Sequence, residues 1–320
     1  MINSEQISAL IENAISSVPY PDEPSQLYQP IKYTMASGGK RLRPTLLLAT
    51  LSALGHKPDE GINQALGIEM FHNFTLLHDD VMDGAELRRG HPTVHTRWNV
   101  NTAILSGDAM LTYAGSFMSR CDDRHLSDVL ELFNRTAMEV YEGQQYDMDF
   151  EARTDISVDQ YIEMIRLKTS VLLACACKLG AILADAPTEI GDAFYQYGIK
   201  LGLGFQLQDD RLDTYGDPVI FGKQIGGDII NEKKTWLLIS ALNLDNSGEL
   251  RSLLGTQLAP AEKVERVRAV YERLGLSEKS AELIDRYARE AVEAISGTPI
   301  SENDRQYFIS LAKSLTKRTF

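Results

Sequence analysis

The chain has 320 residues, of which 43% are apolar and 24% are charged, so its composition is that of an ordinary globular protein and excludes the disordered, collagen-like and coiled-coil classes. With 32 Lys and Arg against 45 Asp and Glu, its net charge is −13, which argues against a nucleic-acid binder held by its overall field. A local cluster of Lys and Arg can still bind an anionic ligand.

Helical periodicity dominates the chain. Apolar residues recur at three- and four-residue steps over residues 126–141 and again over 281–295, and each set forms one stripe on a helix. No sustained two-residue alternation is present, so we expect an all-α fold with essentially no sheet. Helix breaks are expected at 19–24, 38–39, 90–92, 216–227, 245–260 and 297–299. Because no long linker divides the chain, we expect a single domain over residues 1–320.

Features of export and of membrane insertion are missing from the sequence. The N-terminus has neither a basic start nor a continuous apolar run. The most apolar stretch, 171–184, is interrupted by Lys178 and is too short to span a bilayer. The three cysteines have no paired spacing, and we interpret Cys175 and Cys177 as small core residues. These features predict a protein of the cytoplasm without an integral membrane segment.

An Asp-Asp-x-x-Asp pattern occurs twice, with the aspartates Asp79, Asp80 and Asp83 in the first copy and Asp209, Asp210 and Asp213 in the second. On a helix, the outer aspartates of each copy stand one turn apart on the same face. Such close like charges repel one another unless a cation compensates them. Mg²⁺ prefers oxygen ligands and commonly bridges carboxylates to a phosphate, so both copies are candidate magnesium sites.

The alternative interpretation is that each acidic triplet is a solvated surface. Asp122 and Asp123 serve as an internal comparison, because they lack the spacing and lie near an expected helix break. Apolar residues precede both triplets, with Phe74 and Leu77 before the first and Phe205 before the second. This setting favours carboxylates at the rim of an apolar cavity.

Cationic residues form several separate groups. Residues 38–44, with the sequence Gly-Gly-Lys-Arg-Leu-Arg-Pro, combine free backbone N–H groups with cations near a helix start, which suits a phosphate. Arg88 and Arg89 follow the first triplet, and Lys168, Lys223 and Lys233 come later. Each group alone is ordinary surface charge. Together with the acidic triplets, they predict a site for diphosphates that are bound through Mg²⁺ and through direct Lys and Arg contacts.

These motifs, in this order and over nearly the whole chain, resemble those of the trans-isoprenyl (polyprenyl) diphosphate synthases. The resemblance includes Gly143-Gln144 with Asp147, Lys168-Thr169-Ser170 and the Lys233-Lys234-Thr235-Trp236 stretch. It implies an isoprenoid synthase helical bundle around a deep central cavity, with the two Asp-rich helix ends facing each other, and a homodimer. It also implies ionisation of an allylic diphosphate, condensation with isopentenyl diphosphate, and loss of a proton to the departing diphosphate.

The resemblance also implies a role for individual residues. Lys40, Arg43, His72 and Arg89 would bind isopentenyl diphosphate, and Arg88, Lys168, Lys223 and Lys233 would bind the allylic diphosphate. Thr169 and Gln206 would direct oxygen dipoles toward the developing carbocation, with Lys168 beside them. Gln144 and Asp147 would hold the substrate-binding residues in place rather than contact the substrate themselves. The two acidic triplets would hold Mg²⁺. For His72, a plain core histidine is the alternative.

Product length is expected to depend on the helix that leads into the first triplet. Phe71, Phe74 and Thr75 precede Asp79 by eight, five and four residues, so a growing prenyl tail would meet them one to two turns deeper. Large rigid rings there would form a floor, which suggests a farnesyl (C15) or geranylgeranyl (C20) product. The alternative is that both rings only pack against neighbouring helices.

Two other functions fit part of the pattern. A class I terpene cyclase shares the first acidic motif, but it usually carries an Asn/Ser/Glu second motif and does not need a site for isopentenyl diphosphate. A non-catalytic regulatory subunit of a prenyltransferase heterodimer tends to lose aspartates from one triplet, and both triplets are intact here. The sequence therefore favours a short-chain trans-prenyltransferase.

Overall fold

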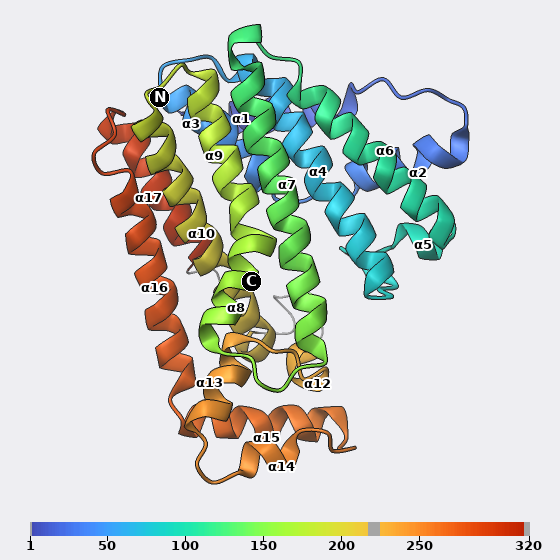
Figure 1. Cartoon of the computed structure of the whole chain (residues 1–320), viewed down its shortest axis with the longest axis vertical. Helices are drawn as coiled ribbons and strands as arrows, with labels where there is room; N and C mark the ends of the chain where they lie inside the picture. Colours follow the sequence, from blue (N-terminus) through green and yellow to red (C-terminus); the bar gives the residue numbers. More distant parts are fainter. Residues whose placement is uncertain (1, 217–224, 317–320) are drawn as a thin grey trace. The chain divides into compact units, whose positions relative to one another are not determined.

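The structure is a computed structural model of the chain, and it describes residues 2–216 and 225–316. These residues are almost entirely helical, which confirms the expected all-α fold (Figure 1). The α-helices of the first part of the chain are α1 (Ser4–Ser16), α2 (Ser25–Ala36), α3 (Leu42–Ala53), α4 (Ile62–Met82), α5 (Val94–Arg97), α6 (Val100–Met118) and α7 (Asp123–Glu151). Those of the second part are α8 (Val158–Ile165), α9 (Val171–Leu183), α10 (Thr188–Tyr215), α12 (Gly227–Ile230), α13 (Trp236–Leu244), α14 (Glu249–Leu253), α15 (Pro260–Arg273), α16 (Leu276–Ala294) and α17 (Glu302–Thr316).

The remaining elements are short. A 3₁₀ turn, η1 (Pro58–Gly61), precedes α4, and a π-helix, η2 (Arg166–Ser170), joins α8 to α9. Strands β1 (Leu87–Arg88) and β2 (His91–Pro92) pair antiparallel, with Arg88 opposite His91. This hairpin is a small departure from the expectation of no sheet. Its turn contains Gly90 at φ 77°, in a region where the sequence predicted only a helix break.

Contacts within the chain divide it into two compact units. Unit 1 comprises Met1–Arg135, Cys175–Phe194 and Pro299–Asp304, and unit 2 comprises Thr136–Ala174, Tyr195–Thr298 and Arg305–Phe320. In unit 1, α4 packs along α6 and against α3. In unit 2, α15 packs against α12, α14 and α16. The single domain over residues 1–320 stays a prediction.

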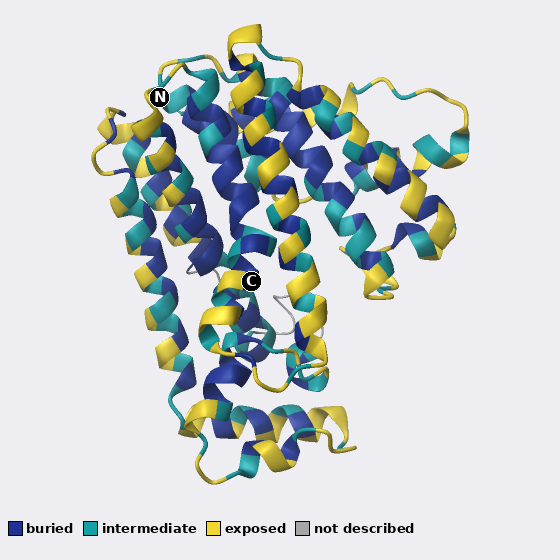
Figure 2. Ribbon diagram, in the orientation of Figure 1, coloured by how far each residue is buried: buried dark blue, intermediate teal, exposed yellow. Residues whose placement is uncertain are grey.

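Burial explains which helix faces form the core. Helix α9 is almost continuously buried, as Figure 2 shows, and Cys175 and Cys177 within it are both 0% exposed, which confirms their interpretation as core residues. Asp122 and Asp123 are exposed just where α7 begins, as expected of a surface pair. Within residues 2–216 and 225–316, no helix combines the length and the apolar character needed to cross a membrane.

Candidate active site

The first acidic triplet lies at the C-terminal end of α4 in unit 1. Asp79 and Asp80 stand in the last turn, and Asp83 is the C-cap, with its N–H donating to the Asp79 carbonyl at 2.8 Å. Arg88, on β1, lies with Nη2 2.7 Å from Asp80 Oδ1 and 3.5 Å from Asp79 Oδ2. Burial raises the pKa of Asp80, while Arg88 opposes the rise. The first triplet is therefore partly neutralised by an arginine of its own unit.

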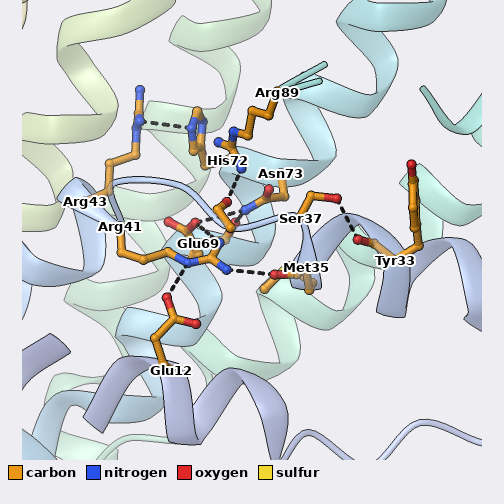
Figure 3. Close-up of polar contacts among 11 residues, drawn as sticks. Glu12, Tyr33, Met35, Ser37, Arg41, Arg43, Glu69, His72, Asn73 and Arg89 are labelled. Atoms are coloured by element: carbon orange, nitrogen blue, oxygen red, sulfur yellow. Dashed lines mark hydrogen bonds and ion pairs between the residues drawn. The ribbon is translucent and has the colours of Figure 1, made fainter. Parts of the chain in front are cut away.

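A group of cations lies near this helix end, around His72 on α4 (Figure 3). Arg43 Nη1 is 3.1 Å from His72 Nε2, and because a guanidinium only donates, this ring nitrogen is the acceptor. Burial, followed by the charges of Arg43 and Arg89, holds the pKa of His72 well below its usual range. Burial and Arg89 also lower the pKa of Arg43 to about 10. Excess positive charge of this kind fits a polyanion.

The turn of the β1–β2 hairpin brings Arg89 close to Arg43 and His72. Arg89 is in the left-handed region at φ 53°, and its Nη1 donates to the carbonyl of Gly38. Arg43 Nε is buried and has no hydrogen-bond partner among the residues that the structure describes. A pocket of unit 1 lies beside this group and is lined by Tyr33, Asn73, Leu76, Asp80, Arg88 and Arg89, with other residues of the hairpin. Unit 1 thus brings Arg43, His72, Arg88 and Arg89 together near the first triplet.

The second acidic triplet lies near the C-terminal end of α10 in unit 2. Asp210 is buried, and it accepts hydrogen bonds from the Tyr161 hydroxyl and, at 3.0 Å, from Gln206 Nε2. Asp213 Oδ2 accepts the N–H of Asp228 at 2.9 Å. Burial raises the pKa of Asp210, although its hydrogen bonds and Lys233 act in the opposite direction. The groups that donate these hydrogen bonds to Asp210 and Asp213 are neutral, whereas the first triplet is contacted by the charged Arg88.

Two residues of this second group are absent from the sequence prediction. Tyr161, on α8, is fully buried, and its phenol holds Asp210 from 49 positions earlier in the chain. Asp228, at the start of α12, has its pKa raised to about 7 by burial and by the charges of Asp210, Asp213 and Asp147. A carboxylate directly after Gly226-Gly227 is a local signal that could have indicated Asp228. No local signal connects Tyr161 with Asp210, because the two are distant in sequence.

Lys168 and Thr169 lie in the π-helix η2, also in unit 2. Lys168 Nζ is 2.6 Å from Asp147 Oδ2, and Lys233 Nζ is 3.9 Å from the same oxygen. Although burial alone would raise it, the pKa of Asp147 is lowered by these two lysines. Thr169 Oγ1 donates to Gln206 Oε1 at 3.0 Å. Thr169, Gln206, Asp210 and Tyr161 therefore form one continuous hydrogen-bonded chain.

The irregular turn η2 is accommodated by Gly143 on α7. A Cβ at Gly143 would lie 2.3 Å from the backbone nitrogen of Lys168 and 2.7 Å from its Cα. Since these are backbone atoms, no side-chain movement can relieve the clash. The missing side chain at Gly143 therefore sets how closely α7 approaches Lys168 and Thr169. Pi-helical turns of this kind are frequent at functional sites.

The residues expected to set product length lie on α4. Phe71 is 0% exposed, and Phe74 is 5% exposed. Their ring centroids are 5.6 Å apart, and Phe71 meets Phe133 edge to face at 5.3 Å. Phe74 also meets the His78 ring at 4.8 Å, and Thr75 Oγ1 donates to the His72 carbonyl at 2.8 Å. The rings pack on one another, and their role as a floor stays a prediction.

The predicted site residues are thus distributed over both units. Lys40 is exposed in the loop before α3, Asp209 is half-buried on α10, and Lys233 is exposed after α12. Lys223 lies outside the described residues. Whether the two triplets face each other, as the resemblance implies, stays a prediction.

The donor set fits a hard divalent cation that shares its coordination with a ligand. No three His, Cys, Asp or Glu side chains of residues 2–216 and 225–316 form a complete metal site by themselves. Burial, with neighbouring carboxylates, raises the pKa of the buried Asp210 and of the half-buried Asp228, so a bound cation would favour their ionised forms. Mg²⁺ usually takes only one or two carboxylates and completes its shell with water and phosphate oxygens. A partial carboxylate set beside cations matches this behaviour.

Comparisons with known proteins agree with this chemistry. The family model of polyprenyl synthetases matches residues 24–274. A geranylgeranyl pyrophosphate synthase of Geoglobus acetivorans is 36% identical over 315 residues, covering 97% of this chain and 96% of the relative. A crystal structure of a geranylgeranyl pyrophosphate synthase matches with a TM-score of 0.96 and 40% identity over 100% of both chains.

A third match was solved with ligands. It is a polyprenyl synthase from Caulobacter crescentus CB15 complexed with calcium and isoprenyl diphosphate, with a TM-score of 0.88 and 28% identity, covering 99% of this chain and 96% of that one. These findings confirm the predicted short-chain trans-prenyltransferase, and they do not support the terpene cyclase or the regulatory subunit. The chain belongs to the polyprenyl synthetase family.

Proposed function

We propose that this protein condenses isopentenyl diphosphate with an allylic diphosphate to give all-trans geranylgeranyl diphosphate, the C20 product. The observation that carries the proposal is the group of Arg43 and Arg89 around the half-buried His72, beside the first acidic triplet, where burial and the accumulated positive charge lower the pKa of His72. The names of the relative from Geoglobus acetivorans and of the solved structure that matches with a TM-score of 0.96 support C20 over C15.

We assign isopentenyl diphosphate to Lys40, Arg43, His72 and Arg89. Neutral His72 donates through the ring nitrogen that Arg43 does not use, and the arginines supply bidentate contacts. In the reaction, the C–O bond of the allylic diphosphate breaks and its electrons leave with the diphosphate. The double bond of isopentenyl diphosphate then attacks the allylic carbon, and a proton passes from the new chain to the departing diphosphate.

We assign the allylic diphosphate to Arg88, Lys168, Lys223 and Lys233. Lys168 and Lys233 share Asp147, which holds both ammonium groups in place, and an ammonium group can donate to more than one acceptor, including phosphate oxygens. The hydroxyl of Thr169 and the amide of Gln206 present fixed oxygen dipoles to the carbocation, because each is held by the chain that ends at Tyr161. Gln144 supports this group from α7.

The carboxylates of Asp79, Asp80, Asp83, Asp209, Asp210 and Asp213 would hold Mg²⁺, with Asp228 as a further oxygen donor. Bound Mg²⁺ would neutralise the diphosphate and make it a better leaving group. The calcium and isoprenyl diphosphate in the Caulobacter crescentus enzyme support a divalent cation with this substrate class. Arg88 holds Asp79 and Asp80 in position.

Two further assignments concern the state of the protein. We propose a homodimer, supported by apolar side chains exposed along α6, at Val100, Ile104 and Leu105. Light scattering of the purified protein tests it, and a monomer at micromolar concentration contradicts it. We propose the cytoplasm because Cys121, Cys175 and Cys177 are free, as in reducing compartments.

The function is tested by incubation with Mg²⁺, labelled isopentenyl diphosphate and, separately, dimethylallyl, geranyl and farnesyl diphosphate. The products are dephosphorylated and sized by mass spectrometry. We expect a C20 all-trans alcohol from all three primers. A C15 end product corrects the chain length only, and products far beyond C20 contradict Phe74 as the floor. If folded, Mg²⁺-loaded protein condenses none of the primers, the proposed activity is wrong.

A further inference from the structure

Arg41 is a buried cation that the assignments above leave without a role. It lies between Lys40 and Arg43, yet only 7% of its surface is exposed, whereas Lys40 is exposed. A charged side chain is rarely buried in this way unless all its donors are paired. The position of Arg41 within the predicted phosphate loop therefore calls for an explanation other than direct ligand contact.

Every side of the Arg41 guanidinium is occupied by a partner from its own unit (Figure 3). Nε donates to Glu12 Oε1 at 2.9 Å, Nη1 to Glu69 Oε1 at 2.7 Å, and Nη2 to the Met35 carbonyl at 2.7 Å. Glu69 is 3% exposed and also accepts from Asn73 Nδ2 at 3.0 Å. With each guanidinium nitrogen bonded inside unit 1 and only 7% of the residue exposed, Arg41 is poorly placed to contact a diphosphate directly. Arg41 instead ties three segments together, namely α1, the end of α2 and α4.

The backbone of Arg41 explains what this anchor accomplishes. Arg41 is the N-cap of α3 and is in the left-handed region at φ 44°, which side chains other than glycine rarely adopt. Such a conformation persists when surrounding contacts enforce it. Its carbonyl accepts the N–H of Thr45 at 3.1 Å, so this turn also starts α3. The anchored side chain therefore fixes the conformation of this turn. The turn in turn sets the positions of Lys40, which precedes it, and of Arg43, in the first turn of α3.

Helix α4 connects this anchor to the assigned substrate cations. Glu69 and His72 are three residues apart and therefore neighbours on one side of α4. Glu69 holds Arg41, and His72 contacts Arg43, so one rigid helix fixes both ends of the segment. On the other side, Arg89 donates to the Gly38 carbonyl, and a Cβ at Gly39 would lie 2.9 Å from its Cζ. Loss of the Arg41 anchor would remove the central attachment of this segment and leave the contacts at its two ends, those of Arg89 with Gly38 and of His72 with Arg43.

We propose that Arg41 is a positioning residue for the isopentenyl diphosphate site, which acts through Glu69 and Glu12 to hold the turn that presents Lys40 and Arg43 to the diphosphate. This inference rests on the proposed function, because it concerns one of the two substrates assigned there. It gives Arg41 a different role from Lys40 and Arg43, which lie in the same cationic segment, residues 38–44. The allylic site, whose lysines belong to unit 2, should not depend on the anchor.

The test is steady-state kinetics of Arg41→Lys and Glu69→Gln with geranyl diphosphate as the primer. Lysine keeps the charge but cannot reach Glu12, Glu69 and Met35 together. We expect the KM for isopentenyl diphosphate to rise about tenfold or more, as is typical when a supporting partner of a binding group is removed. The KM for geranyl diphosphate and kcat should each stay within about threefold, because such a loss affects binding of one substrate only.

Glu12→Gln is the second variant, since it removes only a half-exposed partner and should fold normally. We expect a rise of about two- to threefold in the same KM, because one weaker contact of three is lost. Arg153→Gln, at a half-buried residue of unit 2 paired with Asp155, is the control and should match the wild type. The inference is wrong if the KM for isopentenyl diphosphate is unchanged in the folded variants, or if both KM values rise together. A wild type without condensation activity would instead contradict the proposed function.

Discussion

The two Asp-Asp-x-x-Asp triplets have the same spacing but different surroundings. In unit 1, Arg88 contacts Asp79 and Asp80, and two more cations, Arg43 and Arg89, lie around His72. In unit 2, Asp210 is held by the neutral donors Tyr161 and Gln206, and Asp228 and Asp147 add further negative charge. The first region carries excess positive charge, and the second carries carboxylates that lack full compensation. Identical motifs can therefore differ in what they require from a ligand.

The largest expected effect tests whether both triplets serve the same reaction despite this difference. We expect Asp79→Ala and Asp209→Ala each to lower kcat by about a thousandfold or more, as for loss of a group that stabilises developing charge. Product formation under saturating Mg²⁺ measures this loss. Circular dichroism should show unchanged helix content. Near-normal turnover in either variant would remove that triplet from the metal assignment.

A second change perturbs only the region in unit 2. Gly143→Ala forces a Cβ to within 2.3 Å of the Lys168 backbone nitrogen, so η2 must shift and carry Lys168 and Thr169 with it. We expect kcat/KM for the allylic substrate to fall about a hundredfold, as for a misplacement of about 1 Å at a reacting centre.

The matched control for this variant is Gly115→Ala. Gly115 lies in helix α6, and its added Cβ would meet nothing within 4 Å. That variant should keep full activity and gain about 0.5–1 kcal/mol of stability from helix propensity. Equal activity of both variants would show that the position of η2 does not matter.

A third pair of substitutions compares equivalent positions in the two regions, five residues before each triplet. Phe74 precedes Asp79 and Gly204 precedes Asp209. We expect Phe74→Ala to lengthen the product by one or more C5 units, because a bulky ring is removed from α4, and to destabilise the fold by about 3–5 kcal/mol. Gly204→Ala should leave the product length unchanged. Chromatography of the dephosphorylated alcohols compares the two, and an unaltered product from Phe74→Ala would mean that this ring is not the floor.

The smallest effect concerns the pH dependence of stability in unit 2. Burial and neighbouring carboxylates raise the pKa of Asp228 to about 7, from a reference value of 3.8. Since the folded pKa is raised, the stability contributed by protonated Asp228 is complete below the reference value and is lost as the pH rises through about 7. Metal-free protein should therefore become less stable over this range.

Asp228→Asn imitates the protonated form and should remove this loss. At pH 8 with a chelator, we expect its melting temperature to exceed that of the wild type by about 2–4 °C for each kcal/mol of repulsion relieved. Addition of Mg²⁺ should raise the melting temperature of the wild type more than that of the variant. If Asp228→Asn is less stable than the wild type at pH 8 without metal, the claim that the region in unit 2 carries uncompensated negative charge is wrong.

Much of the fold was predictable because helix formation leaves local traces. The apolar stripe over 126–141 lies within α7, that over 281–295 runs along α16 to its C-cap Ile295, and the breaks at 19–24 and 38–39 separate α1, α2 and α3. The hairpin at 87–92 and the π-helix η2 were not predicted. Two-residue strands are too short to show alternation, and the π-turn depends on the contact of Lys168 with Gly143 on another helix.

The sequence by itself determined the all-α class, the family, and the chain positions of both triplets and of the cations beside them, because these depend on residue type, spacing and order. Only the tertiary structure decided the partners of each charged group. Arg88 pairs with Asp80, Tyr161 holds Asp210, and Arg41 turns away from its neighbours toward Glu69. The last two pairings join residues 49 and 28 positions apart, and the first depends on how the hairpin folds back on the end of α4, so no local pattern encodes them.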